Sequence, residues 1–182
     1  CFWRIDARQA VLAAGALERP VAFPGNDRPG VMMASGVRAY LHRWGVVPGT
    51  RVALFATGDE ARRTARDLAA AGVQIAAVID ARADAPAPEG IDAPYFAGGQ
   101  VVGTSGRLGL TAIRVRAGGR VRRIAADVLA MSGGWSPTVH LACHMDGRPA
   151  WDEARGAFLP PGEGARGAVP GLIPAGAAAG VF

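Results

Sequence analysis

The sequence contains no lysine, only two cysteines and few aromatic residues. The cysteines, Cys1 and Cys143, lie far apart without a CxxC spacing, which argues against both a redox dithiol and a zinc site. This cysteine usage is typical of a protein from a reducing cytoplasm. No apolar run reaches the length of a membrane-spanning helix and no signal peptide opens the sequence, so we expect no membrane association.

The positive charge does not indicate nucleic-acid binding. Arginine alone supplies it, in a chain of formal net charge +5. A nucleic-acid surface requires clustered basic residues with aromatic residues between them for base stacking. The densest run, residues 114–123, instead alternates as the solvated face of a β-hairpin does. We therefore expect no nucleic acid among the partners.

Small and aliphatic residues are abundant, and they predict a layered α/β protein. Hydrophobic residues make up 50% of the chain, which is enough for a folded core. Residues 2–5 alternate like an edge strand, and residues 10–15 form an apolar run typical of a strand buried on both faces. Residues 31–45 have a helical period. Residues 51–56, 59–72 and 73–80 predict strand, helix and strand, a βαβ unit that requires a parallel sheet.

The pattern changes after residue 100. Residues 101–106, 110–119 and 120–134 predict an antiparallel meander, and the last of these segments becomes apolar before it ends in glycines. A loop rich in glycine and proline follows residue 151, and residues 172–175 predict a short strand. Because the sequence begins inside a predicted strand and without Met, we expect it to be the middle of a longer polypeptide.

The predicted βαβ unit carries a partial dinucleotide-binding fingerprint. The turn positions that are usually three glycines fall on Ala56, Gly58 and Ala61. The middle glycine lets the backbone approach the pyrophosphate, and a small third residue lets the helix pack on the sheet. Asp80 ends the second strand about 20 residues on, where a carboxylate accepts a hydrogen bond from a ribose hydroxyl. This spacing favours NAD, although Arg82 beside it is compatible with the 2′-phosphate of NADP.

Asp59 leaves a second interpretation open. It lies where the helix N-terminus would offer free N–H groups to a phosphate. A carboxylate there can cap the helix, satisfy those donors and repel an anion. The alternative is therefore a structural βαβ unit that binds nothing.

Three pairs of small residues end apolar runs, at the carboxyl ends of predicted strands where open α/β sheets bind ligands. They are Ala14 with Gly15, Gly133 with Gly134, and Gly176 with Ala177. The histidines predict no metal site, because His140 and His144 lie four residues apart but lack a carboxylate partner. No catalytic acid–base pair is evident, so the catalytic residues stay unknown.

The order of four segments carries a resemblance to a known family. They read VLAAGALERPVAFPGNDRPGVMMASGVRAYLHRWGVVPG, VALFATGDEARRTARDLAAAGVQIAAVIDAR, MSGGWSPTVHL and GLIPAGAAAG. In this order they resemble the alpha subunits of heterotetrameric sarcosine oxidases, nearly from end to end. GALERPVAFPGNDRPGVM and SGGWSPTVHL are the specific parts, whereas the βαβ unit is generic. Flavin subunits of opine dehydrogenases and hydrogen cyanide synthases share parts of the pattern.

The resemblance implies a Rossmann-like NAD-type domain inserted into part of an FAD-type domain. Residues 1–26 and 137–182 would belong to the FAD-type domain and residues 27–136 to the NAD-type domain. By the same resemblance, certain small residues would lie near FAD: Ala14, Gly15, Gly134, Gly176 and Ala177. The matching positions of the NAD site would be Gly58, Asp59, Asp80 and Arg82.

The implied activity is oxidative demethylation of sarcosine or a similar secondary amine, with FAD and NAD as cofactors. This activity would require the other subunits of a hetero-oligomeric oxidase, because a partner subunit carries the oxidation of the amine. The sequence also lacks the upstream G-x-G-x-x-G motif that binds FAD. We therefore expect the isolated segment to be inactive. Two other functions stay open. The chain could be a non-catalytic dinucleotide-binding or assembly module, or it could be part of a flavin subunit of an opine dehydrogenase or cyanide synthase.

Overall fold

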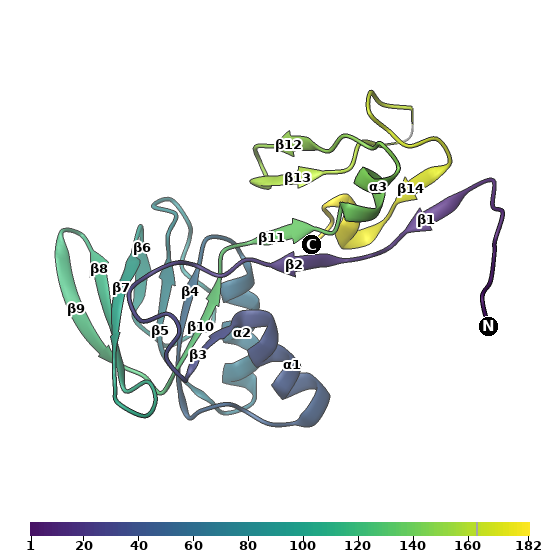
Figure 1. Ribbon diagram of the computed structural model, residues 1–182. Coiled ribbons are helices and arrows are strands. Elements are labelled where there is room, and N and C mark those ends of the chain that lie inside the picture. The colour runs from purple at the N-terminus through teal and green to yellow at the C-terminus, as the bar shows by residue number, and fades with distance from the viewer. Residues whose placement is uncertain (163) are drawn as a thin grey trace. The chain divides into compact units, whose positions relative to one another are not determined.

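The computed structural model describes residues 1–162 and 164–182, and it describes only the backbone of Glu60 and Ala61. The chain forms two compact units. We call Glu18–Gly134 the central unit, and Cys1–Leu17 with Trp135–Phe182 the terminal unit (Figure 1). The predicted division into NAD-type and FAD-type domains concerns cofactors and stays a prediction.

A parallel sheet of five strands forms the middle of the central unit, in the order β3-β10-β4-β5-β6. Every neighbouring pair in it is parallel. This confirms the expected α/β fold with a Rossmann-like parallel sheet. The strands are β3 (Val31–Met33), β10 (Val128–Ser132), β4 (Arg51–Ala56), β5 (Gln74–Asp80) and β6 (Tyr95–Ala97).

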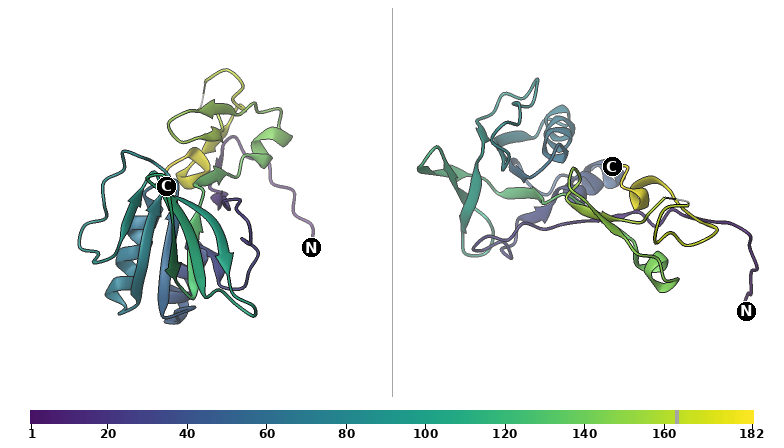
Figure 2. Two further views of the ribbon diagram at one scale, coloured as in Figure 1. Left: turned by 90° about the vertical axis from the view of Figure 1, so that its left-hand side faces the viewer. Right: turned by 90° about the horizontal axis from the view of Figure 1, so that it is seen from above.

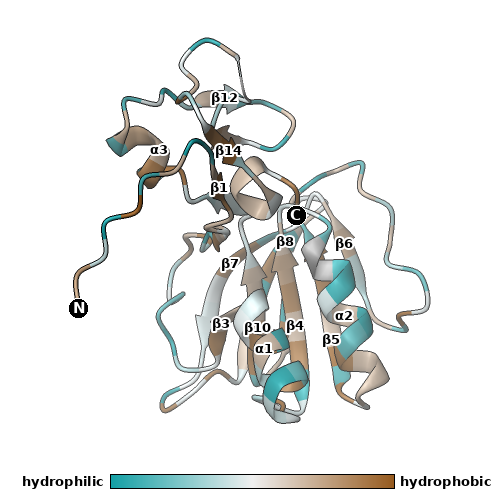
Figure 3. Cartoon of the chain, turned by 90° about the vertical axis from the view of Figure 1, so that its right-hand side faces the viewer, coloured by the Kyte–Doolittle hydropathy of each residue, from teal (hydrophilic) through white to brown (hydrophobic). Residues whose placement is uncertain are grey.

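Helices cover one face of this sheet and an antiparallel meander covers the other. Helices α1 (Ala34–Trp44) and α2 (Glu60–Ala70) lie on the first face, and strands β7 (Gln100–Ser105), β8 (Ala112–Ala117) and β9 (Arg120–Ala125) lie on the second (Figures 1 and 2). Side chains of β4 alternate between the two layers: Leu54 packs in the helix-side cluster and Phe55 in the meander-side cluster. Between their ends the central strands are therefore hydrophobic, whereas the helices carry hydrophilic residues as well (Figure 3).

The βαβ unit is the part of the fold that the sequence specifies most directly. Strand β4 has no polar residue after Arg51, and each of the five residues that follow is buried, as a strand between two layers requires. Helix α2 buries Ala65 and Leu68 against the sheet. Gly72 then adopts φ +78° in the turn, where Val73 donates its N–H to the carbonyl of Leu68 at 3.0 Å. The predicted strand, helix and strand are confirmed.

The first three residues of the predicted helix over residues 31–45 form strand β3 instead. Val31, Met32 and Met33 pair in parallel register with Leu129, Ala130 and Met131. The ladder satisfies their backbone groups, and α1 begins only at Ala34. The end of the prediction is confirmed, since Gly45 closes the helix with φ +64° and donates its N–H to Leu41 O at 2.9 Å.

The predicted meander is confirmed over its first two segments and the start of the third, and it is wrong for the end of the third segment. Strands β7, β8 and β9 pair antiparallel. Residues 128–132 leave the meander and enter the parallel sheet as β10, between β3 and β4. The physical reason lies in burial: residues 120–123 of β9 are all exposed, whereas every residue of β10 is buried. A continuous apolar run cannot occupy a meander edge that faces solvent on one side.

The terminal unit is built from short elements. Strand β1 (Ala10–Leu12) pairs in parallel with β14 (Leu172–Pro174), and β12 (Ala150–Asp152) pairs antiparallel with β13 (Ala157–Leu159). The remaining elements are β11 (Trp135–Pro137), α3 (His140–His144), the 3-10 helix η1 (Gly176–Ala179) and β2 (Ala16–Glu18), whose last residue belongs to the central unit. Strand β14 agrees with the predicted strand over residues 172–175, but the β12–β13 hairpin lies where the composition predicts a loop.

Two predictions for the N-terminal segment are wrong. Residues 2–5 form no strand, and Phe2 is 99% exposed, because no described strand pairs with this segment. The run over residues 10–15 is a strand only at Ala10–Leu12, and Val11 is 66% exposed rather than buried. With β14 as its one partner among the described strands, β1 lacks the neighbours that would bury both of its faces. In the described part of the chain, no helix is both long and apolar enough to span a membrane.

Asp127 ties the start of β4 to the start of β10. Its carboxylate accepts hydrogen bonds from Thr50 N–H at 3.0 Å, from the Thr50 hydroxyl at 2.8 Å and from Arg51 N–H at 2.9 Å. Burial alone would raise the pKa of Asp127, but these hydrogen bonds outweigh it and lower the pKa below its ordinary value. The side chain therefore fixes the register of the two strands that end at the candidate site.

We expect Asp127→Ala to lower the free energy of unfolding at pH 7 by about 1–3 kcal/mol, because two backbone N–H groups lose their acceptor. Asp127→Asn keeps one acceptor oxygen, so its free energy of unfolding should fall by less than that of Asp127→Ala. Because the folded-state pKa is lowered, the carboxylate stabilises the protein above its ordinary pKa near 3.8, and this stabilisation is lost as the pH falls through the folded-state value. Urea unfolding of wild type and Asp127→Asn should therefore differ at pH 7 and converge at the acid end; an undiminished difference would contradict this.

Candidate dinucleotide-binding site

The parallel sheet brings three strand ends to one edge. Ala56, Asp80 and Ser132 each end a strand, and the register places Ala56 opposite both Asp80 and Ser132. The loop after β4 is fixed there, since Thr57 donates its N–H to Ser132 O at 3.0 Å. On the other side, Ala81 donates its N–H to Ala56 O at 2.9 Å. This carboxyl edge is where open α/β sheets bind ligands.

Gly58 lies in the loop between β4 and α2, and the protein itself gives no steric reason for a glycine there. Its φ lies outside the left-handed region, and a Cβ built on it would meet no atom within 4 Å. The space beside its backbone is therefore open to a ligand. Ala56, in the place of the usual first glycine, is 1% exposed and packs in the helix-side core. The side chain of Ala61 lies outside the described residues.

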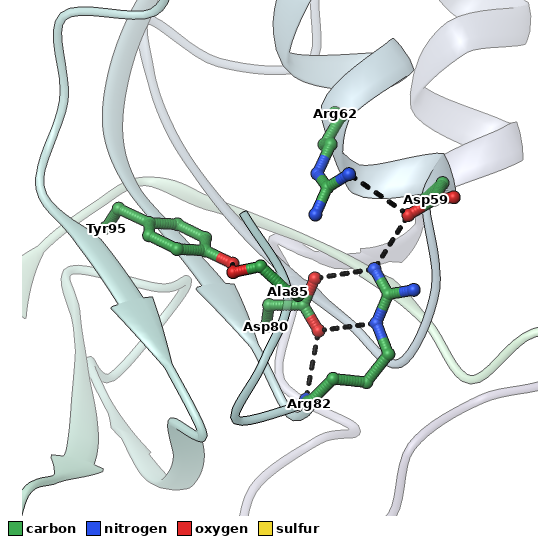
Figure 4. A network of polar contacts seen from close by, with 6 residues as sticks. All are labelled: Asp59, Arg62, Asp80, Arg82, Ala85 and Tyr95. Carbon is green, nitrogen blue, oxygen red and sulfur yellow. Dashed lines mark hydrogen bonds and ion pairs between the residues drawn. The ribbon is translucent and has the colours of Figure 1, made fainter. Parts of the chain in front are cut away.

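Asp80 and Arg82 form a buried ion pair immediately after β5 (Figure 4). Arg82 Nε lies 3.0 Å from Asp80 Oδ1 and Arg82 Nη2 lies 2.8 Å from Oδ2, and the backbone N–H of Arg82 also donates to Oδ1 at 3.0 Å. Asp80 is 2% exposed, whereas the side chain of Arg82 is 36% exposed. A ligand that approaches this strand end therefore meets Arg82 before it meets the carboxylate.

Asp59 belongs to the same network and does not cap α2. Its side chain makes no capping hydrogen bond with the helix. Instead its Oδ1 lies 2.8 Å from Arg82 Nη2 and 3.3 Å from Arg62 Nη1 (Figure 4). The hydrogen bond from Arg82 holds the pKa of Asp59 below its ordinary value, against an opposing effect of burial, and the charge of Arg62 adds to the lowering. The Asp59 carboxylate therefore does not occupy the N–H donors at the start of α2. Arg62 and Arg82 compensate its negative charge.

The network changes what each predicted residue can do. An ionised carboxylate has about four lone-pair sites, and Arg82 uses three of them on Asp80. A ribose hydroxyl would have to share Asp80 with Arg82. The hydrogen bonds that Arg82 donates to Asp80, and the one to Asp59, raise the pKa of Arg82 further above its ordinary value, so the guanidinium stays charged.

Ser132 is a candidate binding residue that sequence analysis missed. It is 2% exposed, and its hydroxyl has no hydrogen-bond partner among the described residues. Ala130, two residues earlier on β10, packs in the helix-side cluster, so Ser132 shares that face of the sheet. The signal in the sequence is a lone polar residue that ends an apolar run before two glycines, but local periodicity assigns the segment to the meander.

The paired glycines after Ser132 have a structural explanation. A Cβ on Gly133 would lie 2.9 Å from the carbonyl oxygen of Arg19, and Gly134 has φ +86°. Backbone hydrogen bonds join Arg19 to Gly134 at 2.8 Å and Gly133 to Arg19 at 2.7 Å. Close backbone approach therefore requires these glycines whether or not a ligand binds, and the predicted role of Gly134 at FAD stays a prediction.

In the terminal unit, parallel pairing brings the other two small-residue pairs together. Leu12 pairs with Pro174, and Ala175 donates its N–H to Leu12 O at 3.0 Å. Ala14 and Gly15 follow one strand, and Gly176 and Ala177 follow the other, so they leave the same edge. Gly15 and Gly176 have positive φ, and a Cβ on either would meet nothing within 4 Å. Open space beside the backbone is what a site for a phosphate or a ring requires.

No group of metal-ligating side chains exists among the described residues. His140 and His144 both lie on α3. Both cysteines are free and exposed.

Comparison with curated proteins identifies the homologues of this chain. It is 49% identical over 161 residues, 88% of its length, to the alpha subunit of sarcosine oxidase from Rhizobium meliloti (strain 1021). It is 42% identical over 171 residues, 87% of its length, to the alpha subunit of sarcosine oxidase from Corynebacterium sp. (strain P-1). This chain is a homologue of part of the sarcosine oxidase alpha subunit. It spans 16% and 18% of the lengths of these relatives.

A more distant relative extends the comparison. The A subunit of opine oxidase from Rhizobium meliloti (strain 1021) is 28% identical over 185 aligned residues, which cover 86% of this chain and 40% of the relative. No family model matches the sequence.

Solved structures share the fold of this chain. L-proline dehydrogenase from P. horikoshii superposes with a TM-score of 0.69 at 21% identity, over 94% of this chain and 30% of that one. Thioredoxin reductase from T. acidophilum superposes with a TM-score of 0.66 at 18% identity, over 92% of this chain and 59% of that one. An FAD-dependent pyridine nucleotide-disulphide oxidoreductase from Desulfovibrio vulgaris superposes with a TM-score of 0.64 at 19% identity, over 94% of this chain and 46% of that one.

We expect Arg82→Met to destabilise the chain by about 2 kcal/mol, because it leaves the buried Asp80 carboxylate without a counter-charge. The loss is smaller than for a fully buried pair, since solvent reaches part of Arg82. The double variant Asp80→Asn with Arg82→Met should recover more than half of the free energy of unfolding that Arg82→Met loses. Urea unfolding at pH 7 measures this free energy for wild type, the single variant and the double variant. Asp59→Asn serves as the control: the side chain is 73% exposed, so its loss should stay below about 1 kcal/mol. Equal losses at Asp59 and Arg82 would contradict the buried pair.

Proposed function

We propose that this chain is the FAD- and NAD-binding core of an oxidoreductase subunit that takes part in oxidative demethylation of sarcosine or a similar secondary amine. The observation that carries the proposal is its 49% identity with a sarcosine oxidase alpha subunit over 88% of its own length. The strand ends of the two units supply places where such cofactors fit. Other subunits of a hetero-oligomeric oxidase, and the amine substrate, complete the proposed system.

The residues at the carboxyl edge of the central sheet fit a dinucleotide. Open space beside Gly58 admits a pyrophosphate to the backbone of the β4–α2 loop. The pairing of Asp59 with Arg62 and Arg82 reduces the repulsion that its carboxylate would exert on a phosphate. Asp80 and Arg82 together form the surface for the ribose, with Arg82 outermost. Ser132 offers a buried hydroxyl at the same edge.

The small residues of the terminal unit fit the proposed flavin. Ala14 and Gly15 would lie near FAD, and Gly176 and Ala177 would approach its ribityl and pyrophosphate portion. The open space beside Gly15 and Gly176 supports this assignment. A flavin supplies hydride acceptance when it is bound, whereas the protein supplies binding, orientation and exclusion of water.

A second function has specific support. Arg82 occupies most of the acceptor capacity of Asp80, and Ala56 replaces the first glycine. Both features favour a dinucleotide-type fold that serves as a non-catalytic assembly module. The likeness to the A subunit of opine oxidase supports a third candidate, a related flavin subunit of an opine-oxidising enzyme.

The flavin assignment predicts colour. The complete protein that contains this sequence, purified with its partner subunits, should be yellow and show the visible absorption spectrum of a bound flavin. Acid release should yield free FAD on chromatography. A colourless preparation that takes up no added FAD would overturn this part of the proposal.

The NAD assignment predicts that Gly58 matters for binding and not for stability. Gly58→Val should weaken NAD binding about tenfold or more in calorimetry, since a side chain would fill the space beside the loop. Gly36→Val is the matched control, because a Cβ there also meets nothing within 4 Å but lies on α1. Asp80→Asn should weaken NAD binding as well. If wild type gives no heat with NAD, the assembly module is supported instead.

A further inference from the structure

The antiparallel meander of the central unit concentrates positive charge. Residues 93–126, which contain its three strands, include six arginines and no carboxylate. All 15 aspartates and glutamates of the chain lie elsewhere, so the meander accounts for the net positive charge of the protein. All six arginines are exposed, and none forms an ion pair in the part of the chain that the structure describes. They are Arg107, Arg114, Arg116, Arg120, Arg122 and Arg123.

The register of β8 and β9 places two like charges directly opposite each other. Arg114 on β8 pairs with Arg123 on β9. The next pair along the ladder, Ile113 with Ile124, packs on the opposite face, toward the meander-side core. Like charges directly opposite in a ladder destabilise a sheet. The pair of arginines therefore lowers the stability of the meander, and no described carboxylate offsets the repulsion.

Strand β9 forms one edge of the meander (Figure 1). Among the described strands it pairs with β8 alone, and this ladder runs through all six residues of β9 without the register shift that interrupts β7 and β8. The other side of β9 therefore presents backbone N–H and C=O groups that no described strand uses. Such a regular, unpaired edge is where an extended segment of another protein adds as a further strand.

Arginines lie on both faces of this edge. Arg123 shares the solvent face with Arg114. Arg122 lies on the other face, where its guanidinium carbon is 5.7 Å from the centre of the Phe96 ring. Arg120 and Arg122 line an open hollow of about 460 Å³ beside β6. Because the side chains of a strand alternate between its faces, acidic residues on either face of an added strand would meet arginines.

Protection of the edge does not by itself account for this pattern. Charged residues on an edge strand commonly prevent pairing with other chains. This would explain the arginines of β9 but not Arg114 and Arg116, which lie on the middle strand, β8. A charge of one sign repels a second copy of β9 and attracts an acidic strand. Strands β8 and β9 also contain no aromatic residue on which nucleic-acid bases would stack.

We propose that the meander binds an extended, acidic segment of a partner protein, which adds to the free edge of β9 as a further strand. Main-chain hydrogen bonds along the edge hold the segment, and its carboxylates pair with Arg122 and Arg123 on the two faces. Arg114 adds to the positive potential that attracts the segment. The inference rests on the proposed function in one respect, the presence of partner subunits, and it concerns neither cofactor position.

Hydrogen exchange tests the added strand, with the complete protein measured alone and in complex with its partner subunits. The backbone N–H groups of residues 120–125 that point away from β8 should exchange at least about tenfold more slowly in the complex, because they gain acceptors there. Strand β4 is the internal reference. It is buried and pairs with β10 and β5, so its exchange should not change when the partner subunits bind.

Neutralising the like-charged pair separates binding from folding. Arg114→Gln with Arg123→Gln should weaken association with the partner subunits about 10- to 100-fold in sedimentation velocity, and should reduce its dependence on salt. The same double variant should unfold at a higher urea concentration than wild type, because the repulsion is removed. Arg114→Lys with Arg123→Lys keeps the charge and should retain most of the affinity. Arg43→Gln with Arg66→Gln, at exposed positions on α1 and α2, is the control and should leave association unchanged.

Several outcomes would overturn the proposal. They are unchanged exchange of residues 120–125 in the complex, equal association of wild type and the Arg114→Gln, Arg123→Gln variant, and a complete protein that binds no partner subunit. Duplex DNA and phosphatidylserine vesicles are further probes. Binding of either through these two arginines at about 150 mM salt, without protection of β9 by the partner subunits, assigns the surface to another class of partner and also overturns the proposal.

This inference and the proposed function fail separately. A yellow protein whose β9 stays unprotected in the complex keeps the flavin assignment and loses the docking strand. A colourless protein whose β9 is protected by the partner subunits loses the flavin assignment and keeps the docking strand.

Discussion

The position of β10 determines the geometry of the central unit. Strands β3 and β4 follow each other closely in the chain but do not pair, because β10 enters between them from about 70 residues further on and pairs with both. Its backbone groups pair with those of β3, which is partly buried, and of β4, which is buried and whose backbone groups could not remain unpaired away from water. Since all these strands run in parallel, their carboxyl ends share one edge. Asp127, just before β10, links the start of this strand to the start of β4 and so fixes their relative register.

The charges at that edge act as one unit. Asp80 is buried and would be unfavourable alone, so Arg82 is held on it by two side-chain hydrogen bonds. Arg82 in turn reaches Asp59, which also meets Arg62. The most exposed side chain of this network is Asp59, at 73%, whereas Arg82 is 36% exposed and Arg62 is 17% exposed. The electrostatic surface offered to a phosphate or ribose depends on these pairings rather than on each residue type alone.

Local patterns predicted the elements whose cause is local. The continuous apolar run of residues 51–56 and the glycine turns after α1 and α2 indicate β4 and the helix ends correctly. Local patterns gave wrong predictions where pairing with residues distant in the sequence sets the structure. Val31–Met33 have a helical period but pair with β10, residues 128–132 follow a meander but leave it, and residues 2–5 alternate without a partner strand. Asp59 illustrates the same limit for side chains, because Arg82 lies 23 positions away and outcompetes the helix terminus for its carboxylate.

The sequence by itself determined the α/β class, the βαβ unit, the spacing of Gly58 and Asp80, and the likeness to sarcosine oxidase alpha subunits, since these depend on periodicity and on order along the chain. Only the tertiary structure decided that Ser132 reaches the same edge as Ala56, that Asp80 is already paired with Arg82, and that Asp59 pairs with Arg62 and Arg82. Each of these depends on which residues distant in sequence are brought into contact. Burial then sets the energetic weight of each contact, because an unpaired charge or donor is costly only where water cannot reach it.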